Sequence, residues 1–197
     1  MTKNITESLA KMIEKGNEGL PLKSDVVKVG FKRLSDTAVI PTRAHESDSG
    51  FDLVANEDVI IEPGKTKVIP TGIAVELPDG YEAQVRPRSG VTAKTKLRVQ
   101  LGTIDNGYTG EIGVIVDNVN SFRADNFASL LTYIDGKTRL DNSDGLYGEG
   151  TYLIRKGDRI AQLVVQELPK VKAVEINDFT QDSERGEGGF GSSGVSS

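Results

Sequence analysis

The spacing of hydrophobic residues changes once along the chain, near residue 26. In residues 1–16 apolar side chains recur every three or four positions, which predicts a short amphipathic helix that ends at Gly16. From about Val26 onward, short runs of Val, Ile, Leu and Thr alternate with turn signals such as Pro-Gly and Asp-Gly. This rhythm is typical of an all-β sandwich or barrel. We therefore predict a mainly antiparallel β core, preceded by a helical extension over residues 1–25.

Two segments break the β pattern. Residues 119–150 are far longer than the connections of a few residues that a compact β domain uses, so they are predicted to be an insertion. Four of the eleven aromatic residues of the chain lie there, which favours an ordered subdomain. Residues 181–197 are rich in Gly and Ser and are predicted to form a flexible arm. The β domain itself is thus expected over residues 26–180.

Composition narrows the classes of function. The 197 residues, 37% of them hydrophobic, suit one globular domain with appendages. The formal net charge of -5 repels a polyanion, so we expect no direct binding of nucleic acid. With no cysteine and a single histidine, His45, any metal would be a hard cation held by oxygen atoms. No apolar run reaches the length of a membrane span or a signal peptide, so we expect a cytoplasmic protein without membrane contact.

The segment "GTIDNGYTGEIG", residues 102–113, contains a candidate catalytic carboxylate. Its pattern predicts a β-hairpin with Asp105 at the bend and Tyr108 beside it. Asp105 is either a simple turn former or a general base held on a rigid support. The next residue, Asn106, stands at a position that we expect to tolerate change.

Two other segments also have both a structural and a functional explanation. In "RPRSGVTAKT", residues 86–95, Ser89 is either an ordinary helix N-cap or, with the arginines, part of an anion site. In "SDSGFDLVA", residues 47–55, Asp48 and Asp52 either flank a solvated turn or order water around Mg²⁺.

The remaining two segments acquire meaning only from their neighbours. "KGDRIAQLVV", residues 156–165, is a turn that leads into a buried strand, and Gln162 matters only if a site surrounds it. "RGEGGFGSSGV", residues 185–195, is nearly half glycine and cannot pack a core. Composition alone therefore leaves open why it contains one arginine, one phenylalanine and two serines.

Taken in order, these five segments resemble the five motifs of the homotrimeric dUTPases, the dUTP diphosphatases. One motif alone is weak evidence, but five in the right order are highly specific. The similarity spans about residues 26–195 and leaves out the insertion. It implies a trimeric jelly-roll β-barrel whose sites are each built from several subunits. It also implies hydrolysis of dUTP to dUMP and pyrophosphate, which keeps uracil out of DNA and supplies dUMP for dTMP synthesis.

The resemblance assigns a role to each matching residue. Asp105 would deprotonate the water that attacks the α-phosphorus, with Mg²⁺ on the phosphates, and Tyr108 would pack under the deoxyribose. Asp52, and with it Asp48, would order water on the metal. The glycine-rich segment 185–195 would be a lid over the nucleotide, in which Phe190 would stack on uracil. The full set of substrate contacts would comprise Arg88, Ser89, Gly90, Gly102, Ile104, Tyr108, Gln162, Arg185, Phe190, Gly191, Ser192 and Ser193.

The insertion resembles those of dUTPases from staphylococcal and related phages, which are associated with binding a repressor protein. Its plainer alternative is a subdomain that only lengthens the rim of the trimer. Two rival functions stay open at this point. One is a dCTP deaminase, which shares the architecture, and the other is a regulatory module that uses the nucleotide as a signal.

Overall fold

The computed structural model describes residues 26–121, 127–140, 145–181, 183 and 186. Within them the chain consists mainly of β-strands, with one short helix, α2 (Ser89–Lys94). The predicted β core is therefore confirmed. The helix predicted over residues 1–16 and most of the arm predicted from residue 181 lie outside the described residues. No helix in the described part is long and apolar enough to cross a membrane.

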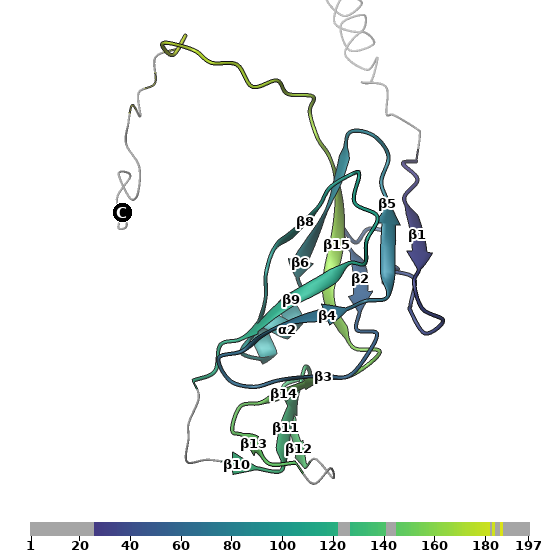
Figure 1. Cartoon of the computed structure of the whole chain (residues 1–197), viewed down its shortest axis with the longest axis vertical. Coiled ribbons are helices and arrows are strands. Elements are labelled where there is room, and N and C mark those ends of the chain that lie inside the picture. The colour runs from purple at the N-terminus through teal and green to yellow at the C-terminus, as the bar shows by residue number, and fades with distance from the viewer. Residues whose placement is uncertain (1–25, 122–126, 141–144, 182, 184–185, 187–197) are drawn as a thin grey trace, which may run out of the picture.

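Two antiparallel sheets form the body of the molecule (Figure 1). The first has the order β2-β15-β6-β8, formed by β2 (Phe51–Val54), β15 (Arg159–Glu167), β6 (Tyr81–Pro87) and β8 (Gly102–Ile104). The second has the order β4-β9-β7, formed by β4 (Thr66–Pro70), β9 (Gly113–Asn118) and β7 (Leu97–Val99). A third sheet pairs β1 (Gly30–Arg33) with β5 (Ile73–Glu76).

Alternating side chains build one hydrophobic core between these sheets. In β9, Val114 and Val116 are buried while Ile115 faces outward, as the two-residue period of a strand requires. Fully buried side chains come from both large sheets and include Leu53, Ile69, Leu97, Val114, Val116 and Leu163. Burial of each such side chain stabilises the fold by about 1.5–3 kcal/mol.

The predicted insertion contains strands and joins the body through a shared sheet. That sheet has the order β12-β11-β14-β3, formed by β12 (Thr138–Leu140), β11 (Leu130–Tyr133), β14 (Tyr152–Ile154) and β3 (Val59–Ile61). β11 runs parallel to β14, and β14 is antiparallel to β3. A smaller pair, β10 (Phe127–Ala128) and β13 (Tyr147–Gly148), lies at the same end of the molecule (Figure 1).

Beyond β15 the chain leaves the body as an extended segment (Figure 1). All residues from 168 to 181 are exposed. Several of them are apolar, with Val171 86% and Phe179 91% exposed. Exposed apolar side chains on an extended segment are typical of a surface that another chain covers.

Candidate functional site

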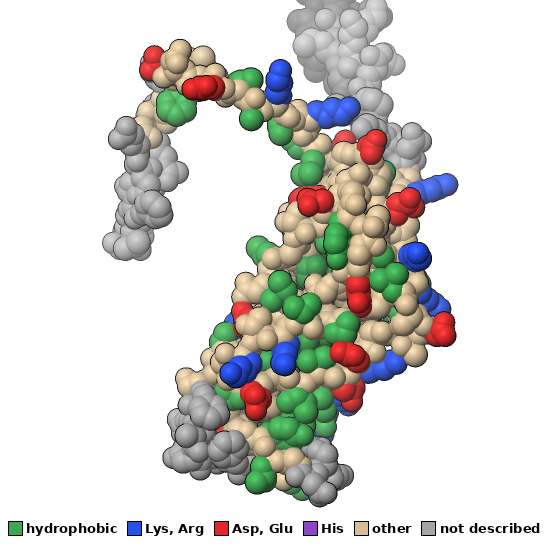
Figure 2. All heavy atoms as spheres, in the orientation of Figure 1, with side chains coloured by type: hydrophobic (Ala, Val, Ile, Leu, Met, Phe, Trp, Pro, Cys, Tyr) green, Lys and Arg blue, Asp and Glu red, His purple; other side chains and the backbone are tan. Residues whose placement is uncertain are grey.

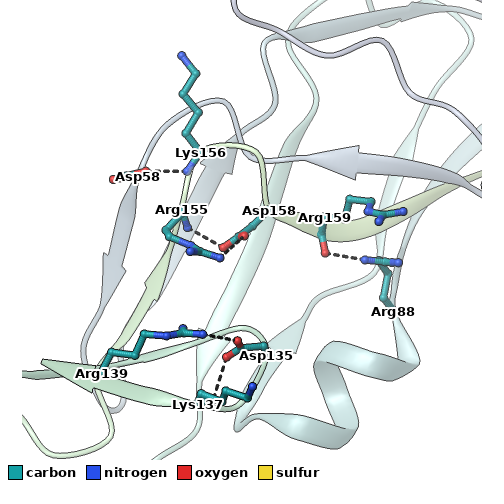
Figure 3. Close-up of polar contacts among 9 residues, drawn as sticks. All are labelled: Asp58, Arg88, Asp135, Lys137, Arg139, Arg155, Lys156, Asp158 and Arg159. Atoms are coloured by element: carbon teal, nitrogen blue, oxygen red, sulfur yellow. Dashed lines mark hydrogen bonds and ion pairs between the residues drawn. The ribbon is translucent and has the colours of Figure 1, made fainter. Parts of the chain in front are cut away.

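The first group of predicted site residues gathers where β6 ends and α2 begins. Arg88 is the N-cap residue of α2. Its Nε lies 3.1 Å from Oδ1 of Asp52, and its Nη1 donates a hydrogen bond of 2.9 Å to the carbonyl of Arg159 (Figure 3). Arg159 in turn places Nη1 3.0 Å from Oδ2 of Asp52. We call Asp52, Arg88 and Arg159 the arginine cluster.

Strand register brings residues of the first, second and fourth motifs together. Asp52 of β2 pairs with Gln162 of β15, and Gln162 pairs with Arg86 of β6, so the three lie in one row across the sheet. Gln162 donates through Nε2 to the carbonyl of Pro87, at 3.0 Å. A side chain at Gly50 would lie 2.7 Å from Oε1 of Gln162, so the glycine of the first motif leaves room for this amide.

Ser89 does not cap the helix, so the ordinary N-cap interpretation is wrong. The cap position belongs to Arg88, and no side chain makes a cap hydrogen bond. Ser89 and Gly90 are exposed at the first two positions of α2. Both residues thus border the arginine cluster and face the solvent.

A metal held by the chain itself does not fit this geometry. Each carboxylate oxygen of Asp52 is engaged by a guanidinium group, and two such cations repel a nearby dication. Asp48 accepts a hydrogen bond of 2.9 Å from the amide of His45 through Oδ2, within a loop. The described residues contain no group of three His, Cys, Asp or Glu side chains that could hold an ion. A direct magnesium site on Asp52 is therefore disfavoured.

The second group of predicted site residues lines one pocket. Gly102, Ile104, Asp105 and Tyr108 border a cavity of about 230 Å³ beside β8. Asp105 is exposed and opens a tight turn, in which its carbonyl accepts a hydrogen bond of 3.0 Å from the amide of Tyr108. The Tyr108 hydroxyl donates to the carbonyl of Glu111 at 2.9 Å.

The hairpin predicted for residues 102–113 is wrong in its pairing. β8 pairs with β6, whereas β9 pairs with β4 and β7, so the turn at Asp105 joins two different sheets. The physical reason lies in Ile104, which is only 6% exposed and contributes to the hydrophobic core from β8. Asp105 does lie on a tight turn, but this turn connects two sheets and is not the bend of a hairpin.

Asp105 lies far from Arg88 within one chain. Ile104 pairs with Ala83, so Asp105 lies about level with Glu82, at the opposite end of β6 from Arg88. Six residues of extended chain at about 3.3 Å each separate Asp105 from Arg88 by roughly 20 Å. Five predicted contacts, Arg185, Phe190, Gly191, Ser192 and Ser193, lie outside the described residues.

Sequence interpretation missed two residues that the structure places at these groups. Arg159 contacts Oδ2 of Asp52, whereas Arg88 contacts Oδ1. Asn106 donates through Nδ2 to the carbonyls of Leu77 and Pro78, at 2.8 and 2.7 Å, and so anchors the turn of Asp105 to the turn between β5 and β6. The positive charge within the fourth motif was a visible signal for Arg159, but the sequence did not indicate Asp52 as its partner.

Comparisons with known proteins identify the family to which the chain belongs. The family model described as dUTPase matches residues 36–125 and 147–194. The deoxyuridine 5'-triphosphate nucleotidohydrolase of Gloeothece citriformis is 38% identical over 173 residues, which cover 87% of this chain and 99% of the relative. That of Rhodococcus erythropolis is 41% identical, over 87% of this chain and 88% of the relative.

Solved structures give the same result. The dUTPase of Staphylococcus bacteriophage 80alpha, solved with dUpNHpp, is 39% identical with a TM-score of 0.81, covering 85% of this chain and 99% of its own. The dUTPase of phage phi11 of S. aureus, described with a species-specific insert, is 34% identical with a TM-score of 0.74, covering 79% of this chain and 99% of its own.

The fold and the family match together define a jelly-roll nucleotide hydrolase, and the chain belongs to the dUTPase family. The predicted fold class is thereby confirmed. Its curated relatives are deoxyuridine 5'-triphosphate nucleotidohydrolases, and the activity of this chain is hydrolysis of dUTP. The rival assignment as a dCTP deaminase finds no support among these relatives.

Proposed function

We propose that the protein converts dUTP to dUMP and pyrophosphate in a homotrimer, at sites that two or more subunits complete. The observation that carries this proposal is the distance between Asp105 and Arg88. A triphosphate bound at the arginine cluster cannot reach Asp105 of the same chain across roughly 20 Å, because it spans only a few bond lengths per phosphate. A neighbouring copy must therefore supply Asp105.

Exposed apolar surface supports the trimer. Val68 of β4 is 63% exposed, Ile115 of β9 is 41% exposed, and the two are register partners on the outer face of their sheet. Figure 2 shows hydrophobic side chains over β4 and β9 on this face. Leu101, 74% exposed, follows β7 in the same sheet. The apolar segment after β15 is a second surface that a neighbouring subunit would cover.

The pocket beside β8 supports recognition of the nucleoside. Backbone groups near Gly102 and Ile104 would bind uracil, while the ring of Tyr108 would exclude a 2'-hydroxyl by its bulk. Its hydroxyl is held by Glu111, so the ring is fixed before substrate arrives. Asp105 would take the proton from the attacking water as general base.

The arginine cluster supports recognition of the triphosphate. Asp52 fixes the guanidinium of Arg88, and Nη2 of Arg88 makes no hydrogen bond to any described residue. That end of the side chain is free to donate to a phosphate oxygen, together with the Ser89 hydroxyl, the Gly90 amide and Gln162. The lid residues Arg185, Phe190, Gly191, Ser192 and Ser193 would close over the nucleotide.

We place the magnesium implied by the resemblance on the substrate. Hard cations keep several waters and bind phosphate oxygens, and Asp52 is already paired with two arginines. A phi11 dUTPase mutant is described with a structural Mg(II) ion, which is a statement about that protein. In this chain Asp52 and Asp48 would contact such an ion only through water.

A second role, in binding a regulatory protein such as a repressor, has support in the insertion. The family model leaves residues 126–146 unmatched, and Leu140 and Leu146 there are 72% and 70% exposed. The dUTPase of Staphylococcus bacteriophage 80alpha is described among phage dUTPases that control transfer of virulence genes. Replacing 126–146 with a short linker should abolish repressor binding and leave a folded trimer, and unchanged binding would contradict this role.

Subunit complementation tests the main proposal. Asp105→Asn and Arg88→Ala should each lose dUTP hydrolysis, by about 100-fold or more for the general base. In trimers reassembled from an equal mixture, an intact site needs Asp105 from an Arg88→Ala subunit and Arg88 from an Asp105→Asn subunit. This combination forms at about a quarter of the sites, so activity should return to about a quarter of that of wild type. Mixed trimers that stay inactive would refute shared sites, and activity on dTTP, dCTP or UTP equal to that on dUTP would refute the specificity.

A further inference from the structure

The turn between β11 and β12 in the insertion lies directly against the helix that presents Arg88 and Ser89. Gly136 has a φ of 81°, and a Cβ built on it would lie 2.7 Å from the carbonyl oxygen of Lys94, the last residue of α2. The backbones of the insertion and of α2 are therefore in close contact. Ile134, two residues before Gly136, packs against the hydrophobic core to which Val91 of α2 belongs.

A second contact fixes the same end of α2. The Tyr152 hydroxyl accepts a hydrogen bond of 2.9 Å from the amide of Lys96, just after the helix. Tyr152 is 5% exposed and lies in β14, where it is the register partner of Thr132 in β11. The sheet that contains the insertion thus holds the C-terminal end of α2 at two points.

The β11–β12 turn is itself stiff. The Tyr133 ring lies between the guanidinium groups of Arg139 and Arg155, at 4.5 and 4.8 Å from its centroid. Arg139 also pairs with Asp135 at 2.7 Å, and Asp135 accepts a hydrogen bond from the Lys137 amide (Figure 3). Such contacts favour one conformation of the turn.

Contacts of Arg155, whose guanidinium lies over the Tyr133 ring, also link the β11–β12 turn to the arginine cluster. Arg155 pairs with Asp158 through its amide, at 2.9 Å, and through Nη2, at 3.3 Å. Arg159 follows directly and pairs with Asp52. Figure 3 shows the Asp135–Arg139, Arg155–Asp158 and Arg159–Arg88 contacts as separate groups in one view.

We propose that the β11–β12 turn, residues 133–137, is a positioning element for triphosphate binding, because it holds α2 and with it Arg88 and Ser89. This inference rests on the proposed function, in which those residues bind the phosphates. α2 has six residues and is about 9 Å long, so a shift at Lys94 moves its first residues as well. The insertion then contributes to triphosphate binding and also presents a surface for partners.

Gly136→Ala tests the positioning role, with Gly64→Ala as the matched control. Both glycines have positive φ, 81° and 71°, so both substitutions carry similar backbone strain. Only the side chain at 136 would meet another backbone, since a Cβ at Gly64 has nothing within 4 Å. The measurements are the affinity for dUpNHpp and for deoxyuridine by calorimetry, and the KM and kcat for dUTP.

In Gly136→Ala we expect the affinity for dUpNHpp to fall by about tenfold relative to the control, with a matching rise in KM. The affinity for deoxyuridine should not change, because the lining of the nucleoside pocket includes no residue of α2 or of the β11–β12 turn. Equal affinities for dUpNHpp in the two variants would overturn the proposal. A parallel loss for both ligands would also overturn it, because that pattern indicates a general loss of structure.

Tyr152→Phe provides a second variant in case Gly136→Ala does not fold. It removes only the oxygen that accepts the Lys96 amide and keeps the buried ring. We expect a loss of a few-fold in dUpNHpp affinity with deoxyuridine binding unchanged, and no change in dUpNHpp affinity would contradict the proposal. Wild-type protein that fails to hydrolyse dUTP would instead refute the proposed function, so the two failures are distinguishable.

Discussion

Asn106 is expected to control the rate of hydrolysis through the turn that holds Asp105. Its Nδ2 donates to the carbonyls of Leu77 and Pro78, at 2.8 and 2.7 Å, and these contacts hold the turn that begins with Asp105. Asn106→Ala removes both. Asp105 would then have more freedom, and the sequence-based expectation that position 106 tolerates change would fail.

The magnitude follows from the two hydrogen bonds. Each contributes a net 0.5–1.5 kcal/mol or so, and one of the two carbonyls is exposed and regains water when the amide is lost. We therefore expect the free energy of unfolding to fall by about 1–2 kcal/mol. A displacement of Asp105 by about 1 Å would lower kcat by roughly tenfold to a hundredfold.

Asn120→Ala is the matched control for this experiment. Asn120 also donates through Nδ2 to a backbone carbonyl, that of Gly150, at 2.9 Å, but far along the chain from Asp105. Denaturant unfolding at one fixed protein concentration and steady-state kinetics should be measured for both variants. We expect both to lose stability and only Asn106→Ala to lose kcat. Equal kcat values in the two variants would refute the reasoning.

Two further predictions concern charge. Arg159→Met should raise the KM for dUTP several-fold, with the difference shrinking at high ionic strength, because it removes a cation from the arginine cluster. Its stability should change by less than about 1 kcal/mol, since the side chain is 56% exposed, and a KM independent of Arg159 would contradict its role. Hydrogen bonds from the Lys137 amide and then from Arg139 hold the pKa of Asp135 below its ordinary 3.8. A lowered folded-state pKa adds stability that is present above the unfolded pKa and is lost as pH falls through the folded one. Thermal unfolding of Asp135→Asn should thus differ from wild type at pH 7 and converge with it once the pH falls below the lowered folded-state pKa of Asp135, whereas a difference that persists in stronger acid would contradict this assignment.

Much of this fold was predictable because its signals are local. Alternation of apolar residues and turn-forming dipeptides indicated the strands, and the order of five motifs indicated the family. Candidate residues such as Arg88 and Asp105 also came from the motifs alone. The partner of β8 was not predictable, because Ile104 joins the hydrophobic core from β8 while residues 97–99 pair with β9.

By itself, the sequence determined the all-β class, the family and the chemical types of the site residues, since these depend on residue identity and short-range spacing. Only the tertiary structure decided which residues meet. Strand register places Asp52 in contact with two arginines and places Asp105 at the opposite end of β6 from Arg88. Packing also set Gly136 against the end of α2. Such contacts join residues dozens of positions apart, and their geometry follows from the burial of side chains throughout the fold, which no short segment specifies.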